Sequence, residues 1–314
     1  MLAISFSDNF IRYGQLIKTD NSISIELIGK KKLPFKFDTT SLKNPDLIPS
    51  IESLLLNIKN RLPVQERFLA LSAPSQLFDI TINSIDLGLE KQKIAEILDW
   101  NEKQRLGVVF NKKFVQHYPL KQRISENKRD YLTISYFKEL GRAIYQACQR
   151  LGFIIKVFDL NIFSAANALE SLYKEKNGKK WGLWLIGEKY HILLLIKSGE
   201  ISQYLEFDLN NDGDYNILVD SNPDEDGKEI VSQINNLRNL SSETIQDIEN
   251  LYFFTYDVNS EFYNMLLTYD IDNLRCVDPF ENFKPIKIYQ DDGSGPGAMS
   301  QFLDVMGLLY RFML

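Results

Sequence analysis

Apolar and polar side chains alternate at the start of the chain, where the run LAISF leads into a polar Asp8-Asn9 pair and a second alternating run. Alternation with a period of two is typical of a β-strand with one buried face. Asp and Asn also tolerate the backbone conformations of tight turns. The pattern therefore predicts a β-hairpin over residues 2–18, followed by a third strand over 22–33.

The same two periodicities divide the rest of the chain. Apolar residues recur at three- and four-residue spacing in the segments expected to be helical, and short apolar or alternating runs mark the strands. We expect helices over 46–62, 91–106, 137–152, 228–240, 241–251 and 259–270 and near the C-terminus. We expect strands over 67–73, 78–87, 108–120, 130–136, 153–160, 181–187, 190–199, 200–209, 251–256 and 273–279, with a polar loop over 210–227.

This order of elements contains a repeat. A meander of three strands begins at residue 2 and again at residue 181, and in each case helices and further strands follow. Short connections make each meander antiparallel, whereas strands joined through helices run parallel. We therefore expect an α/β protein with two lobes and an inserted subdomain. The first lobe takes 1–76, 137–177 and 284–314, the inserted subdomain 77–136, and the second lobe 178–283.

Composition narrows the class of protein. The 314 residues are 44% hydrophobic and carry a net charge of −6, which argues against general binding to nucleic acid or to an anionic membrane. The start of the chain has no basic region before an apolar one, and no apolar run is long enough for a membrane span. Cys148 and Cys276 are far apart and indicate no disulfide framework. We expect a cytoplasmic protein without membrane insertion.

One long segment carries a recognisable pattern. YLTISYFKELGRAIYQACQRLGFIIKVFDLNIFSAANAL, over 131–169, reads as strand, helix, glycine, strand and helix start. The residues that carry it are Gly152, Asp159, Leu160, Phe163 and Ala165.

Two shorter pieces fit the same pattern. ILDWNEKQRLG (97–107) has Trp100 and Gln104 in place, although Gly107 stands where Pro is usual, and VDPFENF (277–283) precedes the final segment. Together the pieces resemble the actin-like superfamily and, within it, the PilM family of type IV pilus assembly proteins. The resemblance implies a duplicated, ribonuclease H-like two-lobed fold with an α/β insertion in the first lobe.

The resemblance also says where a nucleotide would bind. In this superfamily two hairpins and a glycine turn hold ATP between the lobes. Six positions of this chain correspond to that site: Ser5 at an Asp, Ser7 at a Gly, Leu185 at the second Asp, Gly187 at a retained Gly, and Thr255 and Tyr256 at the glycine turn. Leu cannot bind Mg²⁺, and Tyr would fill space that a nucleotide needs. We therefore expect no nucleotide, no cofactor and no ATPase activity.

A partner follows from the same resemblance. PilM proteins bind the short cytoplasmic tail of the inner-membrane protein PilN in a groove between the first lobe and the insertion. By resemblance, this chain docks such a tail near Phe78, Ile80, Ile82 and Trp100, and is held at the inner membrane through that partner. An equally weighted alternative makes Ile80, Ile82 and Trp100 only core of the insertion. Self-association is left open.

Two other functions stay open. The first is an actin-like ATPase or kinase-like enzyme in which Asp8, Asp159 or Glu188 replaces the missing carboxylates, and a magnesium-dependent response to nucleotide would reveal it. The second is the cytoplasmic part of a type II secretion protein of the GspL kind, which shares the fold.

Other motifs are weak. Asp208, Asn210 and Asp212 match the first half of a calcium loop, but Val219 stands at the position of the bidentate Glu. GSGPG at 293–297 lacks the Lys of a phosphate-binding loop. His117 and His191 lie in predicted strands without ligand partners at metal spacing. We expect no metal site.

Overall fold

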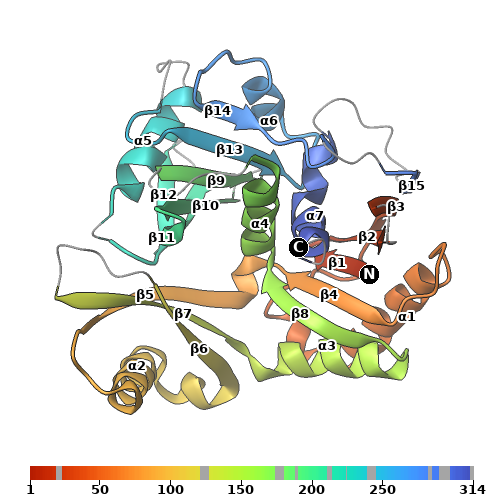
Figure 1. Ribbon diagram of the computed structural model, residues 1–314, viewed down its shortest axis with the longest axis horizontal. Helices are drawn as coiled ribbons and strands as arrows, with labels where there is room; N and C mark the ends of the chain where they lie inside the picture. The colour runs from red at the N-terminus through yellow and green to blue at the C-terminus, as the bar shows by residue number, and fades with distance from the viewer. Residues whose placement is uncertain are drawn as a thin grey trace.

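The computed structural model describes residues 1–18, 23–120, 127–173, 180–187, 190–210, 214–223, 225–238, 245–281, 285–289 and 298–311. Within them the strands form two six-stranded sheets and one three-stranded sheet. Figure 1 shows the two large sheets one above the other, with helices between them, and the small sheet beside the lower one.

The first large sheet has the strand order β15-β3-β2-β1-β4-β8. Its strands are β1 (Leu2–Phe6), β2 (Phe10–Lys18), β3 (Ile23–Lys32), β4 (Phe68–Ala73), β8 (Ile154–Leu160) and β15 (Lys287–Tyr289). The first three pair antiparallel, with Ile4 opposite Tyr13, and β4 joins β1 in parallel. The predicted N-terminal hairpin is therefore confirmed by its pairing. Both of its faces are covered, because the polar residues Ser5, Arg12 and Gln15 are buried as well as the apolar ones.

The second large sheet repeats this plan, in the order β12-β11-β10-β9-β13-β14. Its strands are β9 (Lys180–Ile186), β10 (Tyr190–Lys197), β11 (Glu200–Leu209), β12 (Tyr215–Asp220), β13 (Asn250–Thr255) and β14 (Leu274–Cys276). An antiparallel meander is again followed by two parallel strands. The repeat seen in the sequence is thus a repeat of topology.

Helices cover both sheets. The α-helices are α1 (Leu47–Lys59), α2 (Lys91–Leu106), α3 (Lys138–Arg150), α4 (Asn161–Tyr173), α5 (Gly227–Arg238), α6 (Glu261–Leu266) and α7 (Leu303–Tyr310). Figure 1 shows α4 and α7 between the two large sheets. Gly307 makes their close crossing possible, because a Cβ at this position would lie 1.6 Å from the backbone oxygen of Ser164.

The inserted subdomain is the three-stranded sheet β5-β7-β6 with α2 on one face (Figure 1). Its strands are β5 (Phe78–Asp86), β6 (Lys113–Pro119) and β7 (Lys128–Phe137). Its separate apolar cluster is small, since only Ile85, Leu98 and Tyr131 are buried in it. Short 3₁₀ turns complete the fold at Ser41–Lys43, Ser75–Leu77, Gly107–Lys112 and Ala298–Phe302.

Two predicted elements of the second lobe are wrong. The helix expected over 241–251 is absent from the described residues 245–249, where turns occur and Asp247 has a φ of 60°. There the Asn273 amide donates to Ile248 O (3.0 Å) and its oxygen accepts from the Ile245 N–H (3.3 Å). The polar loop expected over 210–227 contains a strand, β12, because backbone pairing with β11 does not require apolar side chains.

Among the described residues, no helix is long and apolar enough to cross a membrane.

Candidate functional site

A cleft of about 740 Å³ opens between the two lobes. Four of the six positions predicted to be a vestigial nucleotide site line it: Ser7, Leu185, Gly187 and Tyr256. The other two, Ser5 and Thr255, lie fully buried behind its wall. Thr255 Oγ1 donates to Ile186 O of the neighbouring strand β9 at 2.7 Å and accepts from the Asp257 N–H at 2.9 Å. The six positions thus lie in or directly behind the lining of one cleft.

The wall of the cleft behind Ser5 contains a buried carboxylate. Ser5 Oγ donates to Asp304 Oδ2 at 2.5 Å, and the hydroxyl of Tyr256 donates to the same oxygen at 2.6 Å. Asp304 lies on α7 of the first lobe, whereas Tyr256 follows β13 of the second. This oxygen therefore joins the two lobes. Burial raises the pKa of Asp304, and the charge of Arg12 opposes that rise.

Arg12, on β2, completes this network. Its Nη1 donates to Ser7 Oγ at 2.9 Å, and its guanidinium lies 4.1 Å from the centre of the Tyr256 ring. Arg12 and Asp304 are both fully buried. Arg12 and Asp304 therefore lie beside Ser5, Ser7 and Tyr256, three of the six predicted positions.

The open part of the cleft is lined by charges of both signs. Asp8 and Lys30 both line it. Burial raises the pKa of the Asp8 carboxyl, while nearby Lys36 opposes the rise. Asn161, also in the lining, donates from Nδ2 to Phe6 O at 2.6 Å.

Sequence reasoning did not single out Arg12 or Asp304 as site residues. The available signal was a charged residue at a position of apolar periodicity, Asp304 within FLDVMGLLY and Arg12 within FIRYGQL. Buried ions are costly unless they are paired, so such positions indicate a network.

The four side chains predicted to form a partner groove do not lie together. Phe78 and Ile80 are buried, and Phe78 packs on Tyr136 and Phe158 with ring centroids 5.3 and 5.9 Å away. Ile82 is half-buried, and its backbone N–H donates to Ser221 O of the second lobe at 3.1 Å. Trp100 lies on α2 and is 60% exposed. Three of the four thus line the junction of the insertion with the lobes.

A second, more apolar groove lies at this junction, with a volume of about 660 Å³. The inserted subdomain supplies Phe114 from β6 and Tyr136 from β7, whereas the first lobe supplies α3 and β8. Phe114, Tyr136 and Phe158 form an aromatic row, with centroid separations of 5.5 and 5.6 Å. On the α3 side the groove is lined by Gly141, Ile144 and Tyr145. Tyr145 is 57% exposed, and thus the groove opens to solvent.

One wall of the groove is an edge strand. Among the described residues, β8 pairs only with β4. The Ile154 N–H donates to Arg67 O on the β4 side at 2.7 Å. Because successive residues of a strand point their backbone groups to opposite sides, the N–H and C=O of Ile155 point to the free edge. Such an edge can pair with an added strand.

The rim of the groove is basic. Lys138 and Arg142 belong to its lining, and Lys138 Nζ donates to Asn111 O at 2.9 Å. An extended peptide with apolar anchors fits the floor, and acidic groups on it fit the rim.

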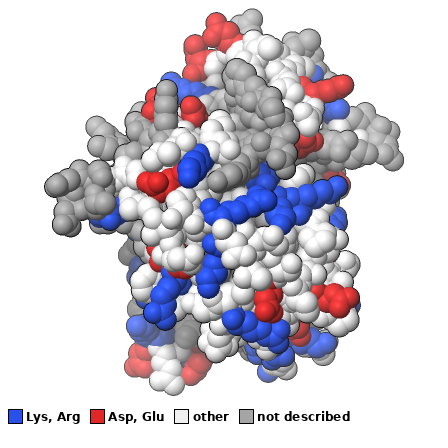
Figure 2. Space-filling model, turned by 90° about the vertical axis from the view of Figure 1, so that its right-hand side faces the viewer, with Lys and Arg blue, Asp and Glu red and all other residues white. Residues whose placement is uncertain are grey.

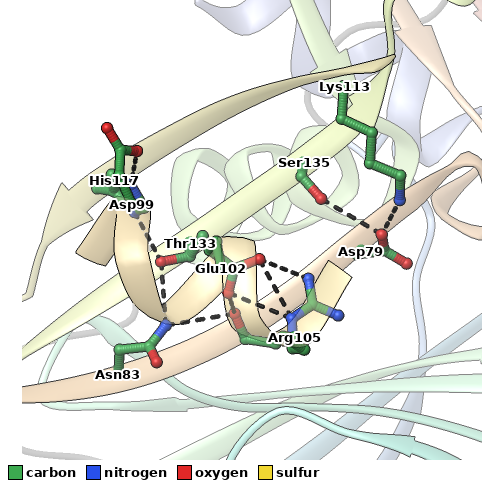
Figure 3. Close-up of polar contacts among 10 residues, drawn as sticks. Asp79, Asn83, Asp99, Glu102, Arg105, Lys113, His117, Thr133 and Ser135 are labelled. Carbon is green, nitrogen blue, oxygen red and sulfur yellow. Dashed lines mark hydrogen bonds and ion pairs between the residues drawn. The ribbon is translucent and has the colours of Figure 1, made fainter. Parts of the chain in front are cut away.

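The helix of the inserted subdomain is held largely by polar contacts (Figure 3). Glu102 is only 1% exposed, accepts from Thr81 Oγ1 at 3.0 Å and pairs with Arg105 at 2.6 Å. His117 bridges Thr133 (2.9 Å) and Asp99 (3.1 Å). On the same sheet Lys113 pairs with Asp79, and burial lowers the pKa of Lys113.

The weaker motifs are accounted for as far as the structure describes them. Asp208 lies in β11 opposite Tyr190 and Asn216, and Asn210 accepts from the backbone N–H of Asp214 at 2.9 Å. Asp212 and the glycine run 293–297 lie outside the described residues. His117 and His191 lie in strands β6 and β10 as predicted. Among the residues described, no three acidic, His or Cys side chains gather as metal ligands would.

The carboxylate of Asp159, at the end of β8, is held by other side chains of the first lobe. It pairs with Arg311 at 2.6 Å and accepts from Ser164 Oγ at 3.3 Å. Burial raises the pKa of Asp159, and Arg311 opposes this.

The duplicated sheets, the helices between them and the interlobe cleft together define an actin-like two-lobed fold. No family model and no curated protein sequence matches the chain. Among solved structures it is similar to a PilM–PilN type IV pilus biogenesis complex, with a TM-score of 0.64 and 14% identity over 99% of this chain and 97% of that one. At this identity the likeness shows a shared fold.

Two further structures are less similar. The cytoplasmic domain of EpsL, an inner-membrane component of the type II secretion system of Vibrio cholerae, has a TM-score of 0.48 and 10% identity, covering 99% of this chain and 92% of that one. A Bacteroides thetaiotaomicron protein with an actin-like ATPase fold has a TM-score of 0.45 and 12% identity, covering 90% and 91%.

Proposed function

We propose that this chain is a non-catalytic, actin-like component of a pilus or secretion assembly platform. In this role it lies in the cytoplasm and binds the short tail of an inner-membrane protein, as a PilN-like partner would provide. The observation that carries the proposal is the apolar groove between α3, β8 and the inserted subdomain.

The groove supports this role in two ways. The row of Phe114, Tyr136 and Phe158 offers apolar contact to alternate side chains of an extended segment. The free edge of β8 offers backbone hydrogen bonds to the same segment. The similar structure is a complex of two proteins, PilM and PilN.

The absence of catalysis is part of the proposal. Its support is the filled phosphate side of the cleft, where Ser5, Arg12, Tyr256 and Asp304 bond to one another. Peptide capture uses none of these groups and does not need a nucleotide.

Binding of a labelled synthetic peptide tests the groove. The probe is the N-terminal cytoplasmic segment of the PilN-like protein from the same host, followed by fluorescence anisotropy. Tyr145→Ala removes an exposed aromatic side chain from the groove, and Trp100→Ala removes one of similar exposure from α2. Loss of an interface aromatic costs roughly tenfold or more in affinity. We expect this loss for Tyr145→Ala and no change for Trp100→Ala.

A second variant tests the edge strand. Ile155→Pro removes a backbone N–H that points away from β4, at an edge position where proline is tolerated. We expect weaker peptide binding with an unchanged unfolding midpoint. Loss of binding in Trp100→Ala alone would move the site to α2, and no binding by the unaltered chain would overturn tail docking.

A further inference from the structure

The edge of the first lobe opposite β8 carries a concentration of positive charge. Strand β3 ends in three consecutive lysines, Lys30 to Lys32, and β15 places Lys287 opposite Leu27 of the same strand. Lys32 and Lys287 are exposed, and Lys30 and Lys31 are half-buried. The Lys30 ammonium lies 4.4 Å from the Phe10 ring centre, at the rim of the interlobe cleft. Figure 2, which faces this side of the molecule, shows Lys and Arg side chains as a broad stripe across its middle, with few acidic groups beside them.

Exposed apolar side chains accompany these lysines. Ile286 and Ile288, on either side of Lys287, are 63% and 51% exposed. The backbone beneath them is fixed, because the Ile286 N–H donates to Ile25 O at 2.9 Å and β15 pairs with β3. A rigid strand edge thus presents isoleucines and lysines together. We call the set Lys30, Lys31, Lys32, Ile286, Lys287 and Ile288 the β3–β15 edge.

The acidic side chains near this edge contact other groups. Asp38 accepts from Thr40 Oγ1 at 2.6 Å and pairs with Lys36 at 3.8 Å. Asp8 lines the interlobe cleft. Glu26, on β3 itself, accepts a hydrogen bond from Ser24 Oγ at 2.5 Å.

We propose that the β3–β15 edge binds an anionic lipid surface. Clustered lysines are attracted to acidic headgroups, and exposed isoleucines among them gain by entering the apolar boundary of the bilayer. The net charge of −6 repels the rest of the molecule from such a surface, so contact is confined to this edge. The net negative charge of the molecule argues against membrane binding by its whole surface. It also fixes the orientation of the molecule when this one edge binds.

A lipid surface fits better than a nucleic acid. The cations of the edge are all lysines. They lack the planar guanidinium group with which arginine makes bidentate hydrogen bonds to bases and phosphates. The exposed apolar groups are aliphatic, whereas binding of single strands relies on aromatic stacking. The proposal does not rest on tail docking, because the edge and the groove share no residue.

Vesicle flotation with the purified full chain and no partner tests the proposal. The probes are vesicles of phosphatidylcholine alone and vesicles containing phosphatidylglycerol. Each lysine near an anionic surface contributes about fivefold in binding. We expect binding to the anionic vesicles only, weakened at high salt, and lowered about a hundredfold by the triple variant Lys30→Gln, Lys31→Gln, Lys32→Gln.

The matched control removes the same charge elsewhere. Lys91→Gln, Lys93→Gln, Lys103→Gln changes three exposed lysines of α2 and leaves flotation unchanged. Ile286→Ser with Ile288→Ser lowers binding severalfold and leaves its salt dependence intact. Unfolding midpoints confirm that each variant folds.

Several results would overturn the proposal: equal binding to both kinds of vesicle, equal loss in the two lysine variants, or no flotation with duplex DNA bound instead. Protection of the lysines by free inorganic phosphate without flotation would show a phosphate site and not a lipid one. Loss of peptide binding in the groove variants leaves this test unaffected, so the two proposals fail separately.

Discussion

At the scale of single residues, the main feature is a buried polar network in one wall of the cleft. Arg12 and Asp304 are fully buried, and Tyr256 contacts both through its ring and its hydroxyl. Removing Asp304 leaves the buried hydroxyls of Ser5 and Tyr256 without this acceptor. The network therefore stabilises the contact between the lobes only as a complete set.

Asp304→Ala tests this dependence. We expect the free energy of unfolding to fall by about 2–5 kcal/mol, because two buried hydroxyls lose their acceptor and Arg12 loses a nearby carboxyl group. Tyr256→Phe, which removes one hydroxyl and keeps the ring over Arg12, should cost only about 0.5–1.5 kcal/mol. Chemical denaturation of the two variants and the unaltered chain measures both values. Equal losses would mean that Asp304 acts only as an acceptor for Tyr256.

His191 gives a pH-dependent prediction. It is stacked on Phe207 at 5.2 Å and accepts a hydrogen bond from Trp184 Nε1 at 3.3 Å. Burial, helped by the charge of Arg238, lowers the pKa of His191 from 6.5 to about 3. Below pH 6.5 the unfolded chain therefore binds a proton that the folded chain does not. The stability due to neutral His191 is complete above pH 6.5 and is lost as the pH falls toward 3.

His191→Phe should remove this component. Between pH 6 and pH 4.5 the unaltered chain should lose about 1.4 kcal/mol per pH unit more than the variant. Urea denaturation across this range measures the two slopes. Parallel curves would show that His191 is protonated without cost in the folded protein.

At the scale of elements, α2 and α7 differ most in how much of each helix is buried. Every residue from Leu303 to Tyr310 of α7 is buried, whereas α2 buries only Leu98 and Glu102 along its sixteen residues. Helices with few buried apolar contacts open locally at low free energy. The inserted subdomain is thus attached to the first lobe by a stable sheet but carries a weakly held helix.

Hydrogen exchange followed by mass spectrometry tests this difference. We expect amides of α2 to exchange much faster than those of α7, at a free energy of opening well below that of global unfolding. Glu102→Gln, which keeps the shape and weakens the pairing with Arg105, should speed exchange in α2 alone. Equal protection in the two helices would contradict the expectation.

The elements also show what a sequence can predict. The N-terminal hairpin and α3 have strong periodicity and were predicted within a few residues, because burial selects apolar residues at a regular spacing. The turn at 245–249 was missed, since Ile245 and Ile248 have helical spacing but are buried by a tertiary contact with Asn273. The groove was missed as a set of residues, because Phe114, Tyr145 and Phe158 come together only through tertiary packing.

At the scale of the whole molecule, the two lobes meet around a cleft of about 740 Å³, for which we propose no nucleotide. A ligand present at about 100 times its dissociation constant adds about 2.7 kcal/mol to stability. We therefore expect saturating Mg-ATP, ADP or GTP to leave the thermal unfolding midpoint unchanged, as scanning fluorimetry would measure. A magnesium-dependent rise of several degrees would favour an ATPase or a nucleotide switch.

The position of α7 has a consequence for how the protein is made. This helix packs against α4 and the strands β1, β2 and β4, yet it is translated after the whole second lobe. During synthesis the second lobe can therefore fold first. The apolar face of β1 and β2 that α7 covers stays exposed to solvent until α7 has been translated. For a chain of this design, a helix translated after the second lobe completes the lobe that was begun first.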